Sequence, residues 1–182
     1  MRWTYLDLIL ELERGTKCVG IRNISWAEDV LHDHFDHDHE AGLKANPVMP
    51  NTLVIEGMAQ CAGILVGHAE DFKQKVLLAK IGKAAFTGLA ARPGTTLRHT
   101  AHLDRLDESG AATRGVVELL DSNTGEAQPY AEIELMFSHI DQNRKGLAFP
   151  DHNFVFTDDF MDLLERSGYP VDPSIDPRRN PR

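Results

Sequence analysis

The chain has 182 residues, of which 42% are hydrophobic and 26% charged, as expected for one soluble domain with a sizeable core. Its formal net charge of −9 argues against a nucleic-acid binder, because phosphate contacts need clustered Lys and Arg. The two cysteines, Cys18 and Cys61, and the lack of a basic, apolar leader predict a cytoplasmic protein without a structural disulfide. The longest apolar run contains Glu56 and Gln60 and is too short for a bilayer, so we expect no membrane span.

Two strands are predicted first. Residues 4–13, TYLDLILELE, have the alternation of a half-buried strand, carried by Leu6, Leu8, Leu10 and Leu12. The turn RGTK then leads into a second strand within KCVGIRNIS, residues 17–25. The histidine-rich stretch HDHFDHDHE, residues 32–40, follows as a loop.

A buried helix is predicted over residues 51–68, NTLVIEGMAQCAGILVGH, after Pro50 and with Asn51 as a possible N-cap. Apolar residues lie on most of its sides, as in a helix enclosed by the rest of a fold. One face differs and carries Glu56, Gln60, Gly63 and Gly67.

Glu56 is the most informative single residue. A carboxylate in an apolar helix has lost most of its hydration, so it must be paired or protonated. Burial favours the neutral form, which makes Glu56 a candidate general acid near neutral pH. The alternative is a structural carboxylate hydrogen-bonded to a backbone amide or an arginine.

Four more strands are predicted, separated by the turn signals RPGT, DESGA and SNTGE: residues 76–86, 95–107, 111–121 and 128–138. Short connections indicate antiparallel pairing of successive strands, with Arg92, Pro93 and Gly94 in a hairpin turn. An antiparallel sheet wrapped around one apolar helix, an α+β fold, buries that helix economically.

Residues 1–140 are expected to form this domain, and residues 141–182 a C-terminal extension. In FTDDFMDLLERSGY, Thr157 as an N-cap and Gly168 as a stop predict a short helix over about 158–167 that docks on the surface. The Pro-rich tail after it is predicted to be disordered.

The segment PVMPNTLVIEGMAQ, residues 47–60, resembles the signature of the 3-hydroxyacyl-ACP dehydratases of the FabA/FabZ type. In that family a His-Phe pair precedes a Pro-x-Met/Phe-Pro-Gly turn and a helix carrying LIxEAMAQ. YLDLILELERGTKCVGIRNIS and LAKIGKAAFTGLAARPGTTL are also similar to the family, so the resemblance covers roughly residues 4–138. It implies the hotdog fold, an antiparallel β-sheet wrapped around a long central α-helix.

The resemblance also implies a reaction: elimination of water from a 3-hydroxyacyl thioester on acyl carrier protein, giving the trans-2-enoyl thioester in fatty-acid or lipid synthesis. Glu56 takes the place of the catalytic acid and His34 that of the catalytic base. Phe35, Asn51 and Gln60 are the expected substrate-binding residues, with backbone N–H groups near Asn51 facing the thioester oxygen. The family's His and Glu meet across an interface, which implies a homodimer or higher homo-oligomer, and no cofactor is implied.

The loop before the helix departs from the family. Asp36 follows Phe35 where the family has Pro, and about eight additional residues precede Pro47, so His37 and His39 stay open as the base. The same loop has a metal-binding alternative, because its histidines and acids suit zinc or nickel: His32, His34, His37 and His39. An incidental loop or a substrate gate are the other interpretations, and we expect no metal.

Three further expectations concern side chains elsewhere. Cys61 is expected to be an inert core thiol. Six basic residues are a candidate rim for an acidic carrier protein, with an ordinary solvated surface as the alternative: Lys73, Lys75, Lys80, Lys83, Arg92 and Arg98. The alternative functions are another hotdog acyl-thioester enzyme, a thioesterase or enoyl-CoA hydratase, or a non-catalytic acyl- or metal-binding protein.

Overall fold

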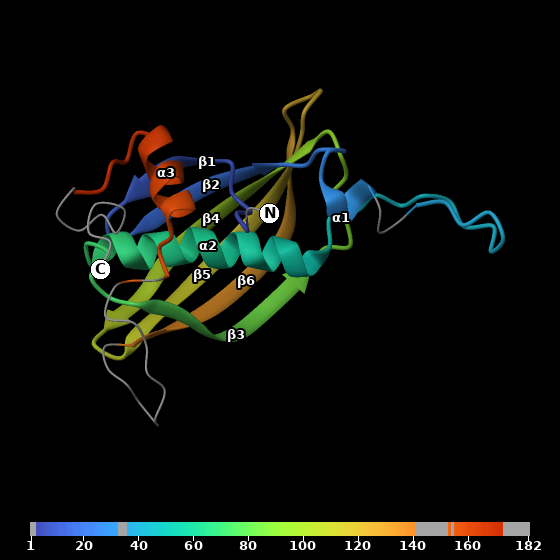
Figure 1. Cartoon of the computed structure of the whole chain (residues 1–182). Coiled ribbons are helices and arrows are strands. Elements are labelled where there is room, and N and C mark those ends of the chain that lie inside the picture. Colours follow the sequence, from blue (N-terminus) through green and yellow to red (C-terminus); the bar gives the residue numbers. More distant parts are fainter. Residues whose placement is uncertain (1–2, 33–35, 141–152, 154, 173–182) are drawn as a thin grey trace.

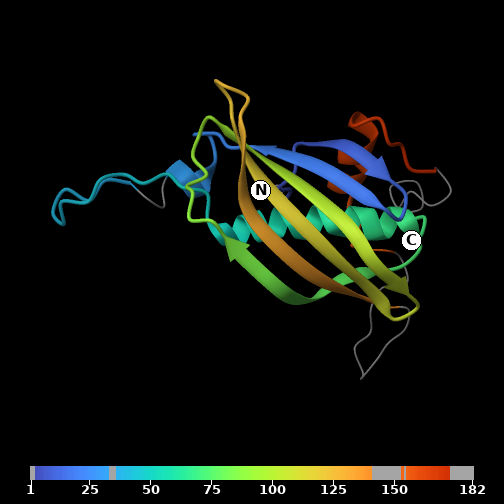
Figure 2. The same cartoon turned by 180° about the vertical axis from the view of Figure 1, so that it is seen from behind.

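One antiparallel sheet of six strands curves around a single long helix (Figure 1 and, from behind, Figure 2). The computed structural model describes residues 3–32, 36–140, 153 and 155–172. Its elements are β1 (Leu8–Glu13), β2 (Lys17–Asn23), α1 (Asp29–His32), α2 (Asn51–Ala69), β3 (Val76–Phe86), β4 (Thr95–Asp107), β5 (Gly110–Asp121), β6 (Ala127–His139) and α3 (Asp158–Arg166). The predicted α+β architecture, a sheet wrapped around a central helix, is confirmed.

The strand order corrects one prediction, because β3 and β4 do not form a hairpin. The order is β1-β2-β4-β5-β6-β3, so β3 pairs with β6 at one edge and β4 lies between β2 and β5. Arg92 and Thr95 do form a turn, in which Thr95 N donates to Arg92 O at 3.1 Å. Residues 87–94 nevertheless cross from the edge to the middle of the sheet, past the start of α2, where Met49 N donates to Ala91 O at 2.8 Å. A turn signal predicts a change of direction and not the strands that it joins.

The inward face of β1 also differs from the predicted alternation. The pairing of β1 with β2 shifts register between Ile9 and Glu11. This bulge turns Ile9 and Leu12 into the core, whereas Leu10 is 49% exposed. The leucine pattern therefore predicted a strand that exists but begins at Leu8 and not at Thr4, and it predicted the buried face only in part.

The central helix α2 is enclosed by the sheet along most of its length. Its apolar side chains lie in the core with almost no exposure: Val54, Met58, Cys61, Ala62, Ile64, Leu65 and Val66. By length and hydropathy α2 is apolar enough to span a bilayer, and 56% of it is buried inside the fold, which accounts for that composition. The predicted N-cap is wrong: Pro50 occupies the capping position without a side-chain cap bond, and Asn51 is the first helical residue.

The C-terminal helix α3 packs on β1 and on the core (Figure 1). Met161, Leu163 and Leu164 are buried, and Ile9 N in β1 donates to Ser167 Oγ at 3.0 Å. Thr157 precedes the helix, and Gly168, at a φ of 85°, ends it, because a positive φ is strained for other residues. The expected disordered tail, from residue 173 onward, lies outside the described residues.

Candidate active site

Glu56 lies on α2 with its carboxylate held by the next turn of the same helix. Gln60 Nε2 donates to Glu56 Oε1 at 2.8 Å. Glu56 is half-buried, whereas Gln60 is 7% exposed. The carboxylate of Glu56 is therefore paired with a neutral amide, an alternative to the backbone amide or arginine considered from the sequence.

Gln60 is itself fixed by the backbone of the N-terminal segment. Tyr5 N donates to Gln60 Oε1 at 2.8 Å, and Gln60 Nε2 donates to Trp3 O at 3.1 Å as well as to Glu56. Because the Tyr5 N–H can only donate, the amide oxygen must face Tyr5 and the NH₂ group must face Glu56. The backbone thus determines which atom Glu56 contacts.

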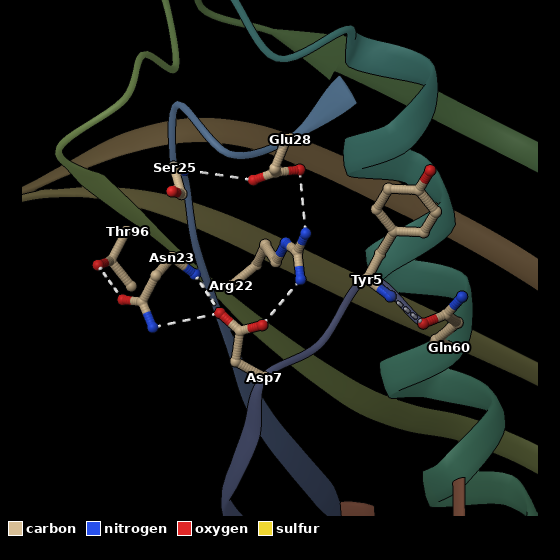
Figure 3. A network of polar contacts seen from close by, with 8 residues as sticks. All are labelled: Tyr5, Asp7, Arg22, Asn23, Ser25, Glu28, Gln60 and Thr96. Atoms are coloured by element: carbon tan, nitrogen blue, oxygen red, sulfur yellow. Dashed lines mark hydrogen bonds and ion pairs between the residues drawn. The ribbon is translucent and has the colours of Figure 1, made fainter. Parts of the chain in front are cut away.

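The N-terminal segment is anchored in turn by a polar network around Arg22 (Figure 3). Arg22 bridges Asp7 Oδ1 at 2.8 Å and Glu28 Oε2 at 3.0 Å. Asp7 Oδ2 accepts from Asn23 N at 2.7 Å, and the Arg22 guanidinium lies 5.8 Å from the centre of the Tyr5 ring. These contacts fix residues 3–7 against β2 and α2, and with them the amide of Gln60.

A cavity of about 210 Å³ opens beside Glu56, Gln60 and Gly63. Apart from Glu56 and Gln60, its lining side chains are apolar and come from α2, β3, β6 and the C-terminal segment. Three members of the face predicted from the sequence therefore share one cavity. The fourth, Gly67, lies against Phe72 and Phe156 and accommodates their rings.

The first turn of α2 offers backbone donors. Leu53 N and Val54 N donate to Pro50 O at 2.9 and 3.3 Å. Among the described residues, Asn51 N and Thr52 N have no acceptor, as is usual at a helix N-terminus. The Asn51 side chain accepts from Tyr130 OH at 3.0 Å, which ties the helix start to β6.

The described part of the histidine-rich loop, from residue 36 onward, extends away from the sheet and α2 (Figure 1). His34 and Phe35, the expected base and its neighbour, lie outside the described residues. Within the described part of the loop, the rings of His37 and His39 stack with centroids 5.6 Å apart, and both residues are exposed. No three His, Cys, Asp or Glu side chains among the described residues converge as metal ligands would.

Apart from Glu56, Gln60 and Gly63, the residues that line the cavity were not predicted as site residues, and the least expected are Val155, Phe156 and Phe160. Phe160 belongs to the segment that was predicted to be a surface-docking helix, and Val155 and Phe156 directly precede it. Residues 156–164 have a strongly apolar face. This face predicts that the segment is buried, but it does not predict which residues the segment packs against.

Other buried polar and sulfur groups lie on the sheet side of α2. His99 in β4 is 1% exposed, and burial lowers the pKa of its imidazole to about 3. Cys61 and Cys18 are free, fully buried neighbours, and their mutual contact, together with burial, raises the pKa of the Cys18 thiol. Cys61 is therefore a core thiol, as predicted.

Three of the six residues of the proposed basic rim are paired with local acids. Lys83 pairs with Glu132 at 2.6 Å and Lys73 with Asp71 at 3.4 Å. Arg98 pairs with Glu118 at 2.8 Å. The solvated-surface interpretation therefore fits at least these three members better than a free basic patch does.

A sheet wrapped around a central helix is the hotdog architecture, and a carboxylate on that helix lies at an apolar cavity. Residues 2–120 match the model of the FabA-like domain. The chain belongs to this FabA/FabZ dehydratase family.

Named relatives agree with this assignment. The chain is 36% identical over 133 residues to a "3-hydroxyacyl-[acyl-carrier-protein] dehydratase FabZ" of Caldanaerobacter subterraneus, covering 72% of this chain and 84% of that protein. It is 32% identical over 148 residues to a protein of the same name from Solibacter usitatus, covering 80% and 82%.

Solved structures support the fold. The dehydratase heterocomplex ApeI:P of Xenorhabdus doucetiae matches with a TM-score of 0.53 at 16% identity, over 75% of this chain and 83% of that one. An acyl-CoA hydrolase mutant of Staphylococcus aureus in complex with coenzyme A matches with a TM-score of 0.54 at 16% identity, over 74% and 71%. At these identities the likeness establishes the shared hotdog fold and not a shared reaction.

Proposed function

We propose that this protein removes water from 3-hydroxyacyl groups carried as thioesters on acyl carrier protein, giving trans-2-enoyl thioesters for fatty-acid or lipid synthesis in the cytoplasm. Glu56 carries the proposal, because it is a paired carboxyl group at the mouth of an apolar cavity on the central helix. The family assignment supports the same reaction.

Glu56 acts as the acid. Oε1 accepts the hydrogen bond of Gln60, so the transferable proton sits on Oε2. When the C3–O bond of the substrate breaks, this proton goes to the departing hydroxyl, which leaves as water. The hydrogen bond to Gln60 holds the carboxyl in one orientation during the transfer.

A histidine of the loop acts as the base, and we assign this role to His34. A neutral imidazole takes the proton from C2, and the electron pair left on C2 forms the new double bond to C3. Negative charge on the thioester oxygen is stabilised by the N–H groups at the first turn of α2, near Asn51, where the helix dipole is positive. Phe35 and Gln60 border the acyl group.

The base comes from a second copy of the chain in a homodimer. Two observations support this arrangement. The described residues 36–46, which follow the assigned base in sequence, extend away from α2 of their own chain (Figure 1). Residues 78–85 of the edge strand β3 are all exposed, including Leu78 at 41% and Ile81 at 45%, and an edge strand presents backbone N–H and C=O groups with which another strand can pair.

The acid is tested by Glu56→Gln, which keeps the shape and the partner of the side chain but not its proton. We expect kcat/KM for dehydration to fall by about 10² to 10⁴-fold with an unchanged circular dichroism spectrum. The assay should follow both the conjugated enoyl product and released thiol, since thiol release would indicate a thioesterase. Retention of most dehydration activity in Glu56→Gln would refute the assignment.

The base is tested by His34→Ala, His37→Ala and His39→Ala, of which only the first should abolish turnover. Mixing inactive Glu56→Gln with inactive His34→Ala then tests the shared site. Random reassortment gives mixed dimers in which one of the two sites has both groups, so about a quarter of the wild-type activity should return. No recovery after confirmed subunit exchange would place both groups in one chain.

A further inference from the structure

The cavity beside Glu56 is lined in part by residues from the C-terminal part of the chain. Its polar side is formed by Glu56 and Gln60, and Val155, Phe156 and Phe160 contribute to the apolar lining. The family model ends at residue 120, so Val155, Phe156 and Phe160 belong to a part of the chain that the family model does not match.

Phe156 packs against α2 at Gly67, where the helix has no side chain. A Cβ on Gly67 would overlap the edge of the Phe156 ring and approach Phe72 Cδ1 to 2.8 Å. The rings of Phe72 and Phe156 meet edge to face with centroids 4.9 Å apart, and Phe156 is 4% exposed. The ring of Phe156 therefore fits into the space at Gly67 on the same helix that carries Glu56.

The backbone leading into the wall is fixed as well. Asn153 Nδ2 donates to Phe72 O at 2.9 Å and to Gln74 O at 3.0 Å. Asn153 Oδ1 accepts from Val155 N at 3.2 Å. Together with the Ile9–Ser167 bond at 3.0 Å, these contacts attach the segment on both sides of Phe160. The wall is a fixed part of the fold.

We propose that this C-terminal wall, residues 155–160, limits the length of the acyl chain that the enzyme accepts. The inference rests on the proposed function, in which the thioester lies at Glu56. From Glu56 to Gly63 the cavity follows about 10 Å of helix, and the acyl chain runs along this face until its end meets Phe160 and Val155. A substrate too long for this space must displace the side chains of Val155 and Phe160, which costs binding energy in the transition state.

Two opposite substitutions test the wall. Phe160→Ala removes a half-buried ring from the cavity, and Val155→Phe adds one. We would measure kcat/KM with 3-hydroxyacyl thioesters of acyl carrier protein from butanoyl to hexadecanoyl length. Phe160→Ala should raise the ratio of kcat/KM for long over short chains by about tenfold or more, and Val155→Phe should lower it by a similar factor.

Met161→Ala is the matched control. Met161 is buried in α3 next to Phe160 and does not line the cavity, so its loss destabilises the extension without enlarging the acyl site. Its chain-length ratio should stay within about twofold of wild type. Two outcomes with an active wild type would overturn the inference and leave the dehydratase function intact. In the first, Phe160→Ala and Val155→Phe do not change the chain-length ratio. In the second, Met161→Ala shifts this ratio as much as they do.

A wild type inactive on every chain length would instead refute the proposed function. The wall would then be tested by calorimetric binding of acyl-pantetheine amides of the same lengths to the same variants. The same shift of about tenfold in the ratio of affinities is expected, and its absence would reject the wall on its own.

Discussion

Gln60 donates its amide hydrogen to Glu56 from one helical turn away, at 2.8 Å, and accepts from Tyr5 N at the same distance. One side chain thus connects the candidate acid to the backbone of the N-terminal segment.

Gln60→Met removes this connection at similar volume. We expect kcat to fall roughly tenfold or more with little change in KM, because the carboxyl group of Glu56 is no longer oriented. The free energy of unfolding should drop by about 1–3 kcal/mol, because Tyr5 N and Trp3 O lose their partner. Steady-state kinetics and urea unfolding measure the two effects. Met161→Ala should lose stability and keep kcat, and an equal loss of kcat in both variants would argue against positioning.

Two glycines of α2 should respond differently to the same substitution. Gly67→Ala should destabilise the protein by about 1–3 kcal/mol, because the methyl group would overlap the Phe156 ring. At Gly63 the nearest side-chain atom, Phe137 Cε1, would be 3.9 Å from the new Cβ, so Gly63→Ala should gain up to about 1 kcal/mol of helix stability. Thermal unfolding compares the pair, and equal effects would contradict the described packing.

His99 should make stability depend on pH. The imidazole has a pKa of about 3 in the fold, against an ordinary value of 6.5, because it is fully buried. As the pH falls below about 6.5 the unfolded chain takes up this proton and the folded chain does not, so the stabilisation present above pH 6.5 is progressively lost down to about pH 3. This difference amounts to about 2 kcal/mol at pH 5.

The measurement is urea unfolding at about pH 7.5 and about pH 5 for the wild type and for His99→Leu, which cannot take up the proton. The variant should lose about 2 kcal/mol less on acidification. Burial also lowers the pKa of His68, so a smaller dependence of the same sign should persist in the variant. Identical pH slopes would show that His99 is not the responsible group.

The edge strand β3 is the expected dimer contact. Ile81→Lys places a charge at the exposed centre of β3 and should shift the protein to monomers in sedimentation velocity, with loss of dehydration because the shared site is broken. Val116→Lys, at a similarly exposed apolar position on β5, is the control and should remain dimeric. A dimer that survives Ile81→Lys and retains activity would exclude this edge.

Local sequence patterns predicted most elements of the fold. β3 and β4 occupy the predicted residues, and α2 ends one residue later than predicted, because turn residues and hydrophobic periodicity are local signals. The strand order arises from pairing between distant segments, which no local pattern encodes. The bulge at Ile9 lies in a local hairpin, but the alternation of side chains does not show where one strand gains an extra residue.

The candidate site also has a part that local sequence predicts and a part that it does not. Glu56 was identifiable because a charged residue interrupts an apolar helix. The backbone partners of Gln60 are 55 and 57 residues away, and Phe156 reaches Gly67 from the far end of the chain, so neither contact was predictable.

The hydrogen bond between Ile9 and Ser167 joins residues 158 positions apart. Contacts of such separation form late in folding, because a long loop must be closed before they contribute. During synthesis the sheet and α2 can assemble while residues 155–167 are still within the ribosome. The nascent protein therefore passes through a stage in which its apolar cavity lacks Val155, Phe156 and Phe160, and the lining is completed when these residues leave the ribosome and pack on α2.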